Sequence, residues 1–176
     1  MGISAERAKY SGITICSRVL YCGMTTTQLM NELGKIAEIL GTNEIRVDNG
    51  PQKYPKLVSY EITLCGIRFA DVHVLPSSKE SGGTVESIDF YVINWARAVN
   101  LTGANERVVV RKVREKEYTP FSNVYYGGIL LPNYMMRDVT ESKVYEQVTY
   151  RYTATLYAHM KTGEVSSVHI NRTKRR

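Results

Sequence analysis

The stretch from 144 to 160 alternates apolar and polar residues almost without interruption. A period of two is typical of a β-strand with one buried face and one solvent-facing face. Unbroken, a strand of this length would span about 56 Å at ~3.3 Å per residue, which is long for a compact domain. We therefore expect a bend, a bulge or a break, either at Glu146, where the apolar face first fails, or near His159.

A second pattern has the helical period. Four apolar residues recur at spacings of four, three and four and therefore share one helix face: Leu29, Leu33, Ile36 and Leu40. Thr25 and Gln28 have the spacing of a capping box, and Gly41 is a natural C-terminal stop. The pattern predicts an amphipathic helix over about 26–40 that must lie on an apolar surface.

Most of the remaining pattern predicts strands. The other apolar or alternating runs are separated by turn residues and cover 13–22, 57–64, 67–75, 84–95, 107–113 and 165–170. Short connections such as Cys65-Gly66 are typical of hairpins, and helices do not alternate with these strands. We therefore expect an α+β fold, with a mainly antiparallel, curved sheet of about seven strands or a small barrel, packed by the one helix.

Length and charge add an outline of the whole chain. The 176 residues fit a single domain over 1–171, followed by a short basic tail over 172–176. The net charge is +6, and all of it arises after residue 88, where fourteen Lys/Arg face eight Asp/Glu. Three cysteines without a C-x-x-C pair predict neither a disulfide framework nor a zinc site. The absence of a long apolar run favours a cytoplasmic protein without a membrane partner.

The segment 118–136 breaks the strand pattern with two prolines, a Gly-Gly pair and no clean period. An irregular apolar segment of this length is unusual in a compact domain unless it is functional, and Tyr and Met are enriched at protein contacts. We expect it to dock on another subunit or on a target protein through Tyr118, Phe121, Tyr125, Tyr126, Tyr134 and Met135. The alternative is that it folds over its own sheet and is partly a strand.

Nucleic acid is the alternative partner. Aromatic rings and cations on one sheet face can stack bases and bind phosphates. The outward face of 144–160 and the tail would supply Tyr145, Arg151, Tyr157, Lys161, Arg172, Lys174, Arg175 and Arg176. An ordinary solvated sheet face accounts for the strand residues equally well.

Candidate chemistry is sparse. Asp71 and His73 share a strand face but lack a third ligand, so we expect a hydrogen-bonded pair and no metal site. His159 and His169 flank the last hairpin without the H-x-T or H-x-S sequence of two-histidine phosphoesterases. Glu141-Ser142-Lys143 has the E-x-K form of metal-dependent nucleases, which is a third hypothesis. Phosphate-binding loops and nucleophile elbows are absent, and no cofactor is predicted.

These observations favour a binding protein over an enzyme. The leading hypothesis is a non-enzymatic protein that works by protein–protein contact through 118–136. It would be a subunit of an assembly, such as a viral or phage structural protein, or a small inhibitor or adaptor. The viral suggestion rests on analogy of architecture alone.

Overall fold

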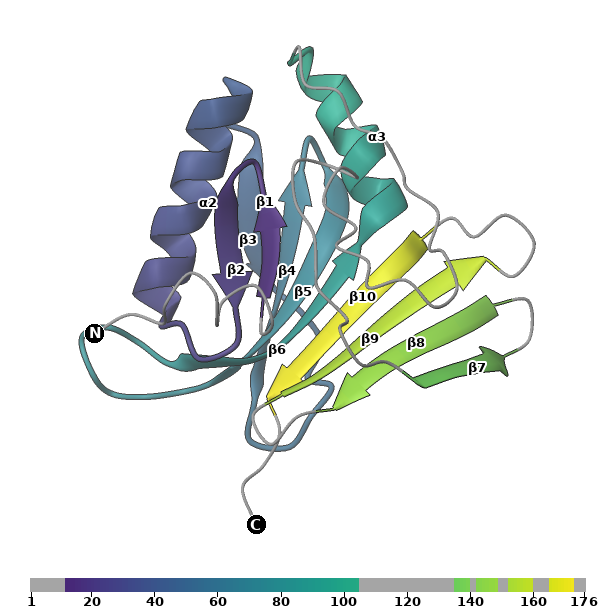
Figure 1. Cartoon of the computed structure of the whole chain (residues 1–176). Helices are drawn as coiled ribbons and strands as arrows, with labels where there is room; N and C mark the ends of the chain where they lie inside the picture. The colour runs from purple at the N-terminus through teal and green to yellow at the C-terminus, as the bar shows by residue number, and fades with distance from the viewer. Residues whose placement is uncertain (1–11, 105–134, 140–141, 149–151, 160–164, 173–176) are drawn as a thin grey trace.

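The structure is a computed structural model that describes residues 12–104, 135–139, 142–148, 152–159 and 165–172. Its fold is α+β, as expected, with two helices and an antiparallel sheet in this part of the chain (Figure 1). The helices are α2 (Thr26–Leu40) and α3 (Val92–Thr102). The strands are β1 (Gly12–Ile15), β2 (Arg18–Tyr21), β3 (Ile45–Asn49), β4 (Val58–Leu64), β5 (Ile67–Leu75), β6 (Thr84–Tyr91), β7 (Met135–Val139), β8 (Ser142–Val148), β9 (Tyr152–His159) and β10 (Val165–Arg172).

The main sheet is open. Its strands follow the order β3-β4-β5-β6-β10-β9-β8-β7, and every neighbouring pair is antiparallel. Because the outermost strands β3 and β7 do not pair with each other, the described residues form no closed barrel. The expectation of about seven strands or a barrel is therefore not confirmed. Strands β3 and β7 were not expected, and the predicted strand 107–113 lies outside the described residues.

Helix α2 confirms the predicted amphipathic helix. The hydroxyl of Thr25 accepts a hydrogen bond from the Gln28 amide at 3.1 Å, and the Gln28 side chain accepts one from the Thr25 amide at 2.9 Å. Gly41 ends the helix with a φ of 67°, a left-handed conformation that glycine adopts without strain. The four predicted residues Leu29, Leu33, Ile36 and Leu40 are all buried.

Two predicted strands have different structures. In place of the predicted strand 13–22 the chain forms the β1–β2 hairpin from Gly12 to Tyr21, because Cys16 and Ser17 turn with φ values of 49° and 65°. Residues 84–95 were expected to be one strand, but β6 ends at Tyr91 and α3 follows at once. The apolar run Val92-Ile93 fits either structure. The buried stripe of Val92, Trp95, Ala98 and Val99 shows that the helical period applies.

The stretch 144–160 is not one strand. It forms β8 and β9, which lie side by side, so the break falls between Val148 and Tyr152 and not at Glu146 or near His159. Tyr145 stands opposite Leu156 in the register, whereas Tyr157 stands opposite Val144. Since alternate residues belong to opposite faces of a sheet, Tyr145 and Tyr157 do not share the outward face that the sequence pattern predicted.

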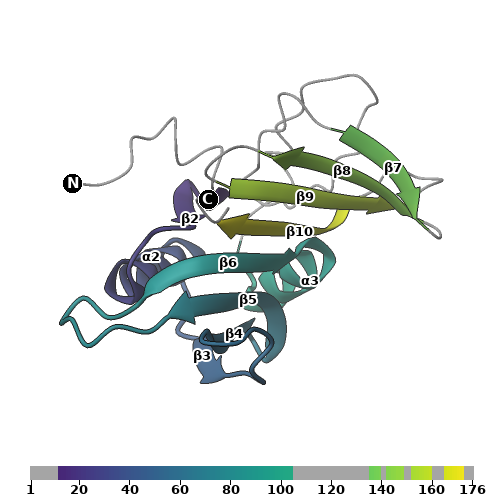
Figure 2. The ribbon, with the colours of Figure 1, turned by 90° about the horizontal axis from the view of Figure 1, so that it is seen from below.

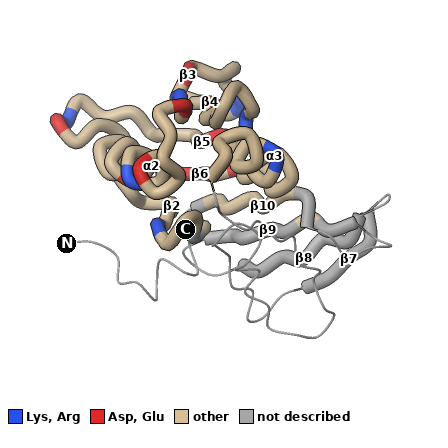
Figure 3. The backbone as a smooth tube through the Cα atoms, turned by 90° about the horizontal axis from the view of Figure 1, so that it is seen from above, with Lys and Arg blue, Asp and Glu red and all other residues tan. Residues whose placement is uncertain are grey.

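The core lies between the sheet and the helices. Helices α2 and α3 lie over the same face of the sheet, as the views from below and from above both show (Figures 2 and 3). Trp95 on α3 packs at 4.7 Å between ring centroids on Phe69 and at 6.2 Å on Phe90. On this face Ala70, Val72, Ile88, Phe90, Val168 and Ile170 are buried in adjacent register positions.

The opposite face of the sheet is polar. Register places Ser59, His73 and Ser87 in one row across β4, β5 and β6. The next row runs across β3 to β9 and contains Asp48, Glu61, Asp71, Asp89, His169 and Thr155. We call this second row the acidic row. In the part of the chain that the structure describes, neither helix has the length and apolarity needed to cross a membrane.

Candidate functional site

The polar face is partly covered by the β3–β4 loop, residues 50–57. Register places Asp89 two strands beyond β4, on β6. Lys53 nevertheless lies with its ammonium 3.6 Å from the carboxylate of Asp89. The ring of Tyr54 meets the imidazole of His73 edge-on, with 4.9 Å between the ring centroids. The loop therefore crosses β4 and β5 on the polar face and delivers two side chains to the centre of the sheet.

Beneath this loop, hydrogen bonds link four strands. Ser59 Oγ lies 2.8 Å from His73 Nδ1, and His73 Nε2 lies 3.4 Å from Asp89 Oδ2. The other carboxylate oxygen of Asp89 bonds to His169 Nδ1 on β10. We call Ser59, His73, Asp89 and His169 the relay. Its inner members are buried, with His73 at 2% and Ser59 at 5% relative exposure, so substrate chemistry at the Ser59 hydroxyl is unfavourable.

Asp89 is held in the charged form. Burial acts to raise the pKa of Asp89, but hydrogen bonds from His169 and His73 and the charge of Lys53 outweigh it and bring the pKa well below its ordinary value. The same contact raises the pKa of Lys53, chiefly through the charge of Asp89. A carboxylate can only accept hydrogen bonds. His73 Nε2 and His169 Nδ1 therefore carry the hydrogens that they share with Asp89.

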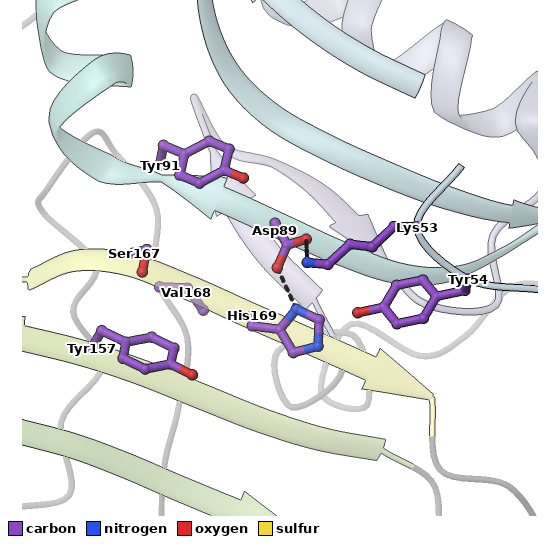
Figure 4. A pocket seen from close by; sticks show the side chains of 8 residues that line it. All are labelled: Lys53, Tyr54, Asp89, Tyr91, Tyr157, Ser167, Val168 and His169. Carbon is purple, nitrogen blue, oxygen red and sulfur yellow. Dashed lines mark hydrogen bonds and ion pairs between the residues drawn. The ribbon is translucent and has the colours of Figure 1, made fainter. Parts of the chain in front are cut away.

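Beside the relay lies a pocket of about 250 Å³ (Figure 4). Its walls come from the β3–β4 loop, β6, β9 and β10, and are formed by Lys53, Tyr54, Asp89, Tyr91, Tyr157, Ser167, Val168 and His169. The side chain of Lys53 is 57% exposed and that of His169 is 25% exposed, whereas Asp89 is 13% exposed. A small solute therefore has access to the lysine and the histidine, while Asp89 lies behind them.

The neighbouring carboxylate, Asp71, belongs to a separate cluster. It accepts a 2.6 Å hydrogen bond from the Tyr91 hydroxyl and lies 3.5 Å from Arg68 Nε. Burial and the bond to Asp71 raise the pKa of Tyr91 well above its ordinary value, so Tyr91 stays protonated. Arg68 also pairs with Glu61 at 3.2 Å. The single charge of Arg68 thus offsets only one of the two negative charges of Glu61 and Asp71, and Tyr91 adds a neutral hydrogen bond to Asp71.

The predicted hydrogen-bond partner of His73 was wrong. Asp71 and His73 do share a face, but His73 bonds to Asp89 on the next strand, and Asp71 bonds to Tyr91 and Arg68. Lys53 and Tyr54 were not among the predicted site residues, and Asp89 was not expected to bond to either histidine. The period-two pattern could have placed Asp89 on a polar face, but only the pairing of β5, β6 and β10 brings the two histidines to it.

The predicted partner-binding residues lie almost entirely outside the described residues, namely Tyr118, Phe121, Tyr125, Tyr126 and Tyr134. Met135 is the first residue of β7, so the end of segment 118–136 is a strand. The segment's docking role stays a prediction.

Three of the eight predicted nucleic-acid-binding residues lie in the described part of the chain. Tyr157 lines the pocket, Tyr145 belongs to β8, and Arg172 ends β10. Arg151, Lys161, Lys174, Arg175 and Arg176 lie outside the described residues, as does Glu141 of the nuclease hypothesis. Within the described ranges, no group of three or more His, Cys, Asp or Glu side chains is placed to hold a metal ion.

Comparisons with known proteins add no assignment. No protein family, curated protein or solved structure matches the chain. Any functional conclusion must therefore rest on the chemistry of the pocket.

Proposed function

We propose that the protein is a binding protein that holds a small anionic ligand in the pocket beside Asp89. The observation that carries this proposal is that the pocket's carboxylate, Asp89, already has its partners within the protein. Asp89 is the one acidic side chain among the lining residues, and its two oxygens already face His73, His169 and Lys53. Its charge is thus compensated by the protein itself.

The accessible polar groups around Asp89 can act as donors. Lys53 supplies an ammonium, and Tyr54 and Ser167 bring hydroxyl groups to the pocket wall. An ammonium and hydroxyl groups around a small cavity are suited to the oxygens of a carboxylate or phosphate, which accept charge-assisted hydrogen bonds. The cation that already faces Asp89 is exposed enough to face a ligand as well.

The size of the site limits the ligand. A volume of about 250 Å³ lies just below the ~300 Å³ at which pockets for drug-sized molecules begin. A small metabolite, or one group of a larger molecule, fits this space. The acidic row makes the adjoining face of β3 to β5 unfavourable for an extended polyanion, since Asp48, Glu61 and Asp71 lie along it. A compact anion is therefore favoured over a polynucleotide laid across these strands.

The test is anion titration with a lysine variant. We expect inorganic phosphate or acetate to cause saturable amide NMR shifts around Lys53, Tyr54 and His169. Lys53→Gln should weaken the affinity by about tenfold, because a charge-assisted contact contributes roughly 1.5 kcal/mol. Lys79→Gln, which removes an exposed cation from the β5–β6 loop, is the matched control and should bind as the wild type does. Absence of saturable shifts, or equal affinities of Lys53→Gln and the wild type, would refute the proposal.

A further inference from the structure

The two accessible ends of the pocket offer opposite hydrogen-bonding groups. Lys53 is a donor only. His169 uses Nδ1 to donate to Asp89, and its other nitrogen, Nε2, lies on the far side of the ring from Asp89 (Figure 4). In the neutral imidazole a nitrogen without hydrogen is an acceptor. Nε2 makes no hydrogen bond with any residue in the described part of the chain. The relay thus presents an acceptor, and the loop presents a charged donor, to the same small space.

A ligand that satisfies both ends must carry an O–H and an anionic oxygen on one head group. Carboxylates and sulfate are fully ionised near neutral pH and carry only acceptor oxygens. A phosphate or phosphate monoester has its second pKa near 6, so its monoprotonated form is readily available close to neutral pH. Its hydroxyl can donate to Nε2 while another oxygen accepts from Lys53.

Resting on the proposed anion site, we infer that the pocket selects a phosphate head group, free or as a small monoester, and that His169 determines this selectivity. Lys53 provides affinity for any anion. His169 discriminates, because a fully ionised ligand would set an oxygen lone pair against the Nε2 lone pair. Facing contacts between unmatched polar groups are costly when water is partly excluded.

Groups from the β3–β4 loop and from β5, β6 and β9 surround His169. The facing groups are Lys53 and Tyr54 from the loop, Asp89 and Tyr91 from β6, His73 and Asp71 from β5, and Tyr157 and Thr155 from β9. Of these, Asp89 bonds to the imidazole directly, and Asp71 is occupied by Tyr91 and Arg68. No carboxylate among the described residues therefore competes for Nε2, which faces the ligand space.

The experiment compares four probes by calorimetric titration at pH 7.5: inorganic phosphate, methyl phosphate, sulfate and acetate. We expect both phosphates to bind at least about tenfold more tightly than sulfate and acetate. Equal affinity for the two phosphates means that the head group alone is recognised, and tighter methyl phosphate means that the pocket also contacts the ester group. Sulfate binding as tightly as phosphate overturns the inference but leaves the anion site standing. If none of the four probes binds, the proposed function itself fails.

Two further arms assign the selectivity to His169. The variant His169→Asn keeps an amide donor for Asp89 but removes Nε2, so its phosphate-to-sulfate ratio should fall to near one. Lys53→Gln should weaken the binding of every anion while preserving the phosphate-to-sulfate ratio of affinities. Because His169→Asn could affect folding, His169→Gln is tested beside it, since its amide can also donate to Asp89 without supplying Nε2. A phosphate-to-sulfate affinity ratio that keeps its wild-type value in both variants contradicts the inference.

Discussion

At the scale of single residues, Asp89 organises the polar face. One carboxylate accepts from a buried histidine on β5 and a half-buried histidine on β10, and it faces a lysine from the β3–β4 loop. These partners come from parts of the chain up to 116 positions apart, Lys53 to His169. Because His73 is 2% exposed, it has no access to water that could replace Asp89. The carboxylate therefore stabilises the fold as well as shaping the pocket.

Replacing this carboxylate tests its structural role. Asp89→Asn should destabilise the protein by about 3 kcal/mol, since removal of one partner from a buried ionic cluster leaves the others uncompensated. Urea unfolding at pH 7 measures the effect. Asp48→Asn is the matched control, because Asp48 is an exposed member of the same acidic row on β3, and it should change stability by less than about 0.5 kcal/mol.

The pH dependence of the same variant has a defined sign. The pKa of Asp89 is lower in the folded state than the ~3.9 of an unfolded aspartate. The unfolded chain therefore binds a proton first on acidification. The stability contributed by Asp89 is complete well above pH 4 and is lost as the pH falls toward the lower folded value. The difference in unfolding free energy between the wild type and Asp89→Asn should shrink between pH 5 and pH 3. A constant difference over this range would contradict the assignment.

At the scale of elements, helix α2 shows what local sequence can specify. Its cap, its buried stripe and its glycine stop all follow from short-range rules, and each is present in the structure. The hairpin of β4 and β5 was predictable for the same reason, since Cys65 and Gly66 turn with φ values of 51° and 77°. Helix α3 was not predictable, because its first residues continue the apolar run of β6. Burial of Trp95 against Phe69 favours a helix for that segment. This contact joins separate elements, so it could not be read from local sequence.

Two glycines, one inside α2 and one at its C-terminal end, provide a prediction at this scale. Gly34 lies in the helix interior with open space where a Cβ would stand, so Gly34→Ala should stabilise the protein by about 1 kcal/mol. Gly41 has the same open space but a φ of +67°, so Gly41→Ala should destabilise the protein by about 1 kcal/mol. Thermal and urea unfolding of both variants measure the effects. Shifts of the same sign in the two variants would contradict this assignment of the helix and its end.

At the scale of the whole molecule, the site could not be predicted because it depends on the order of strands. The polar residues of β5 and β6 could be recognised from alternation, but the sequence does not indicate that β10 lies beside β6. Nor does it indicate that the loop between the edge strand β3 and its neighbour β4 crosses to Asp89. Such arrangements are set by packing of the sheet against the hairpin and helices. The prediction of one strand over 144–160 was wrong for a related reason. The chain changes strand between Val148 and Tyr152, and the register of β8 and β9 then places residues that shared a face in the sequence pattern on opposite faces.

The distribution of charge also belongs to this scale and bears on partners. Residues 12–104 carry eight Lys/Arg and nine Asp/Glu, so the net charge of +6 arises elsewhere in the chain. The described charges over the helices and strands β3 to β6 are mixed in sign (Figure 3). A nucleic-acid partner would therefore depend on basic residues outside this region, including Lys174, Arg175 and Arg176. That hypothesis requires binding that weakens steeply with salt and is lost when 172–176 are deleted.

Self-association through 118–136 is the prediction that concerns the molecule as a whole. Size-exclusion chromatography with light scattering, read at 260 and 280 nm without nuclease treatment, should show a discrete multimer with the absorbance ratio of pure protein. Replacing Tyr125 and Tyr126 with serine should then shift it toward the monomer, because aromatic side chains dominate contact energies. Deletion of 172–176 is the control and should leave the multimer intact.

A clean monomer would contradict self-association and leave docking on a different protein to be sought by pull-down. A monomer with high 260 nm absorbance that is lost in salt would favour nucleic acid. Since the described residues that line the pocket beside Asp89 all belong to one chain, anion binding should be the same in each case.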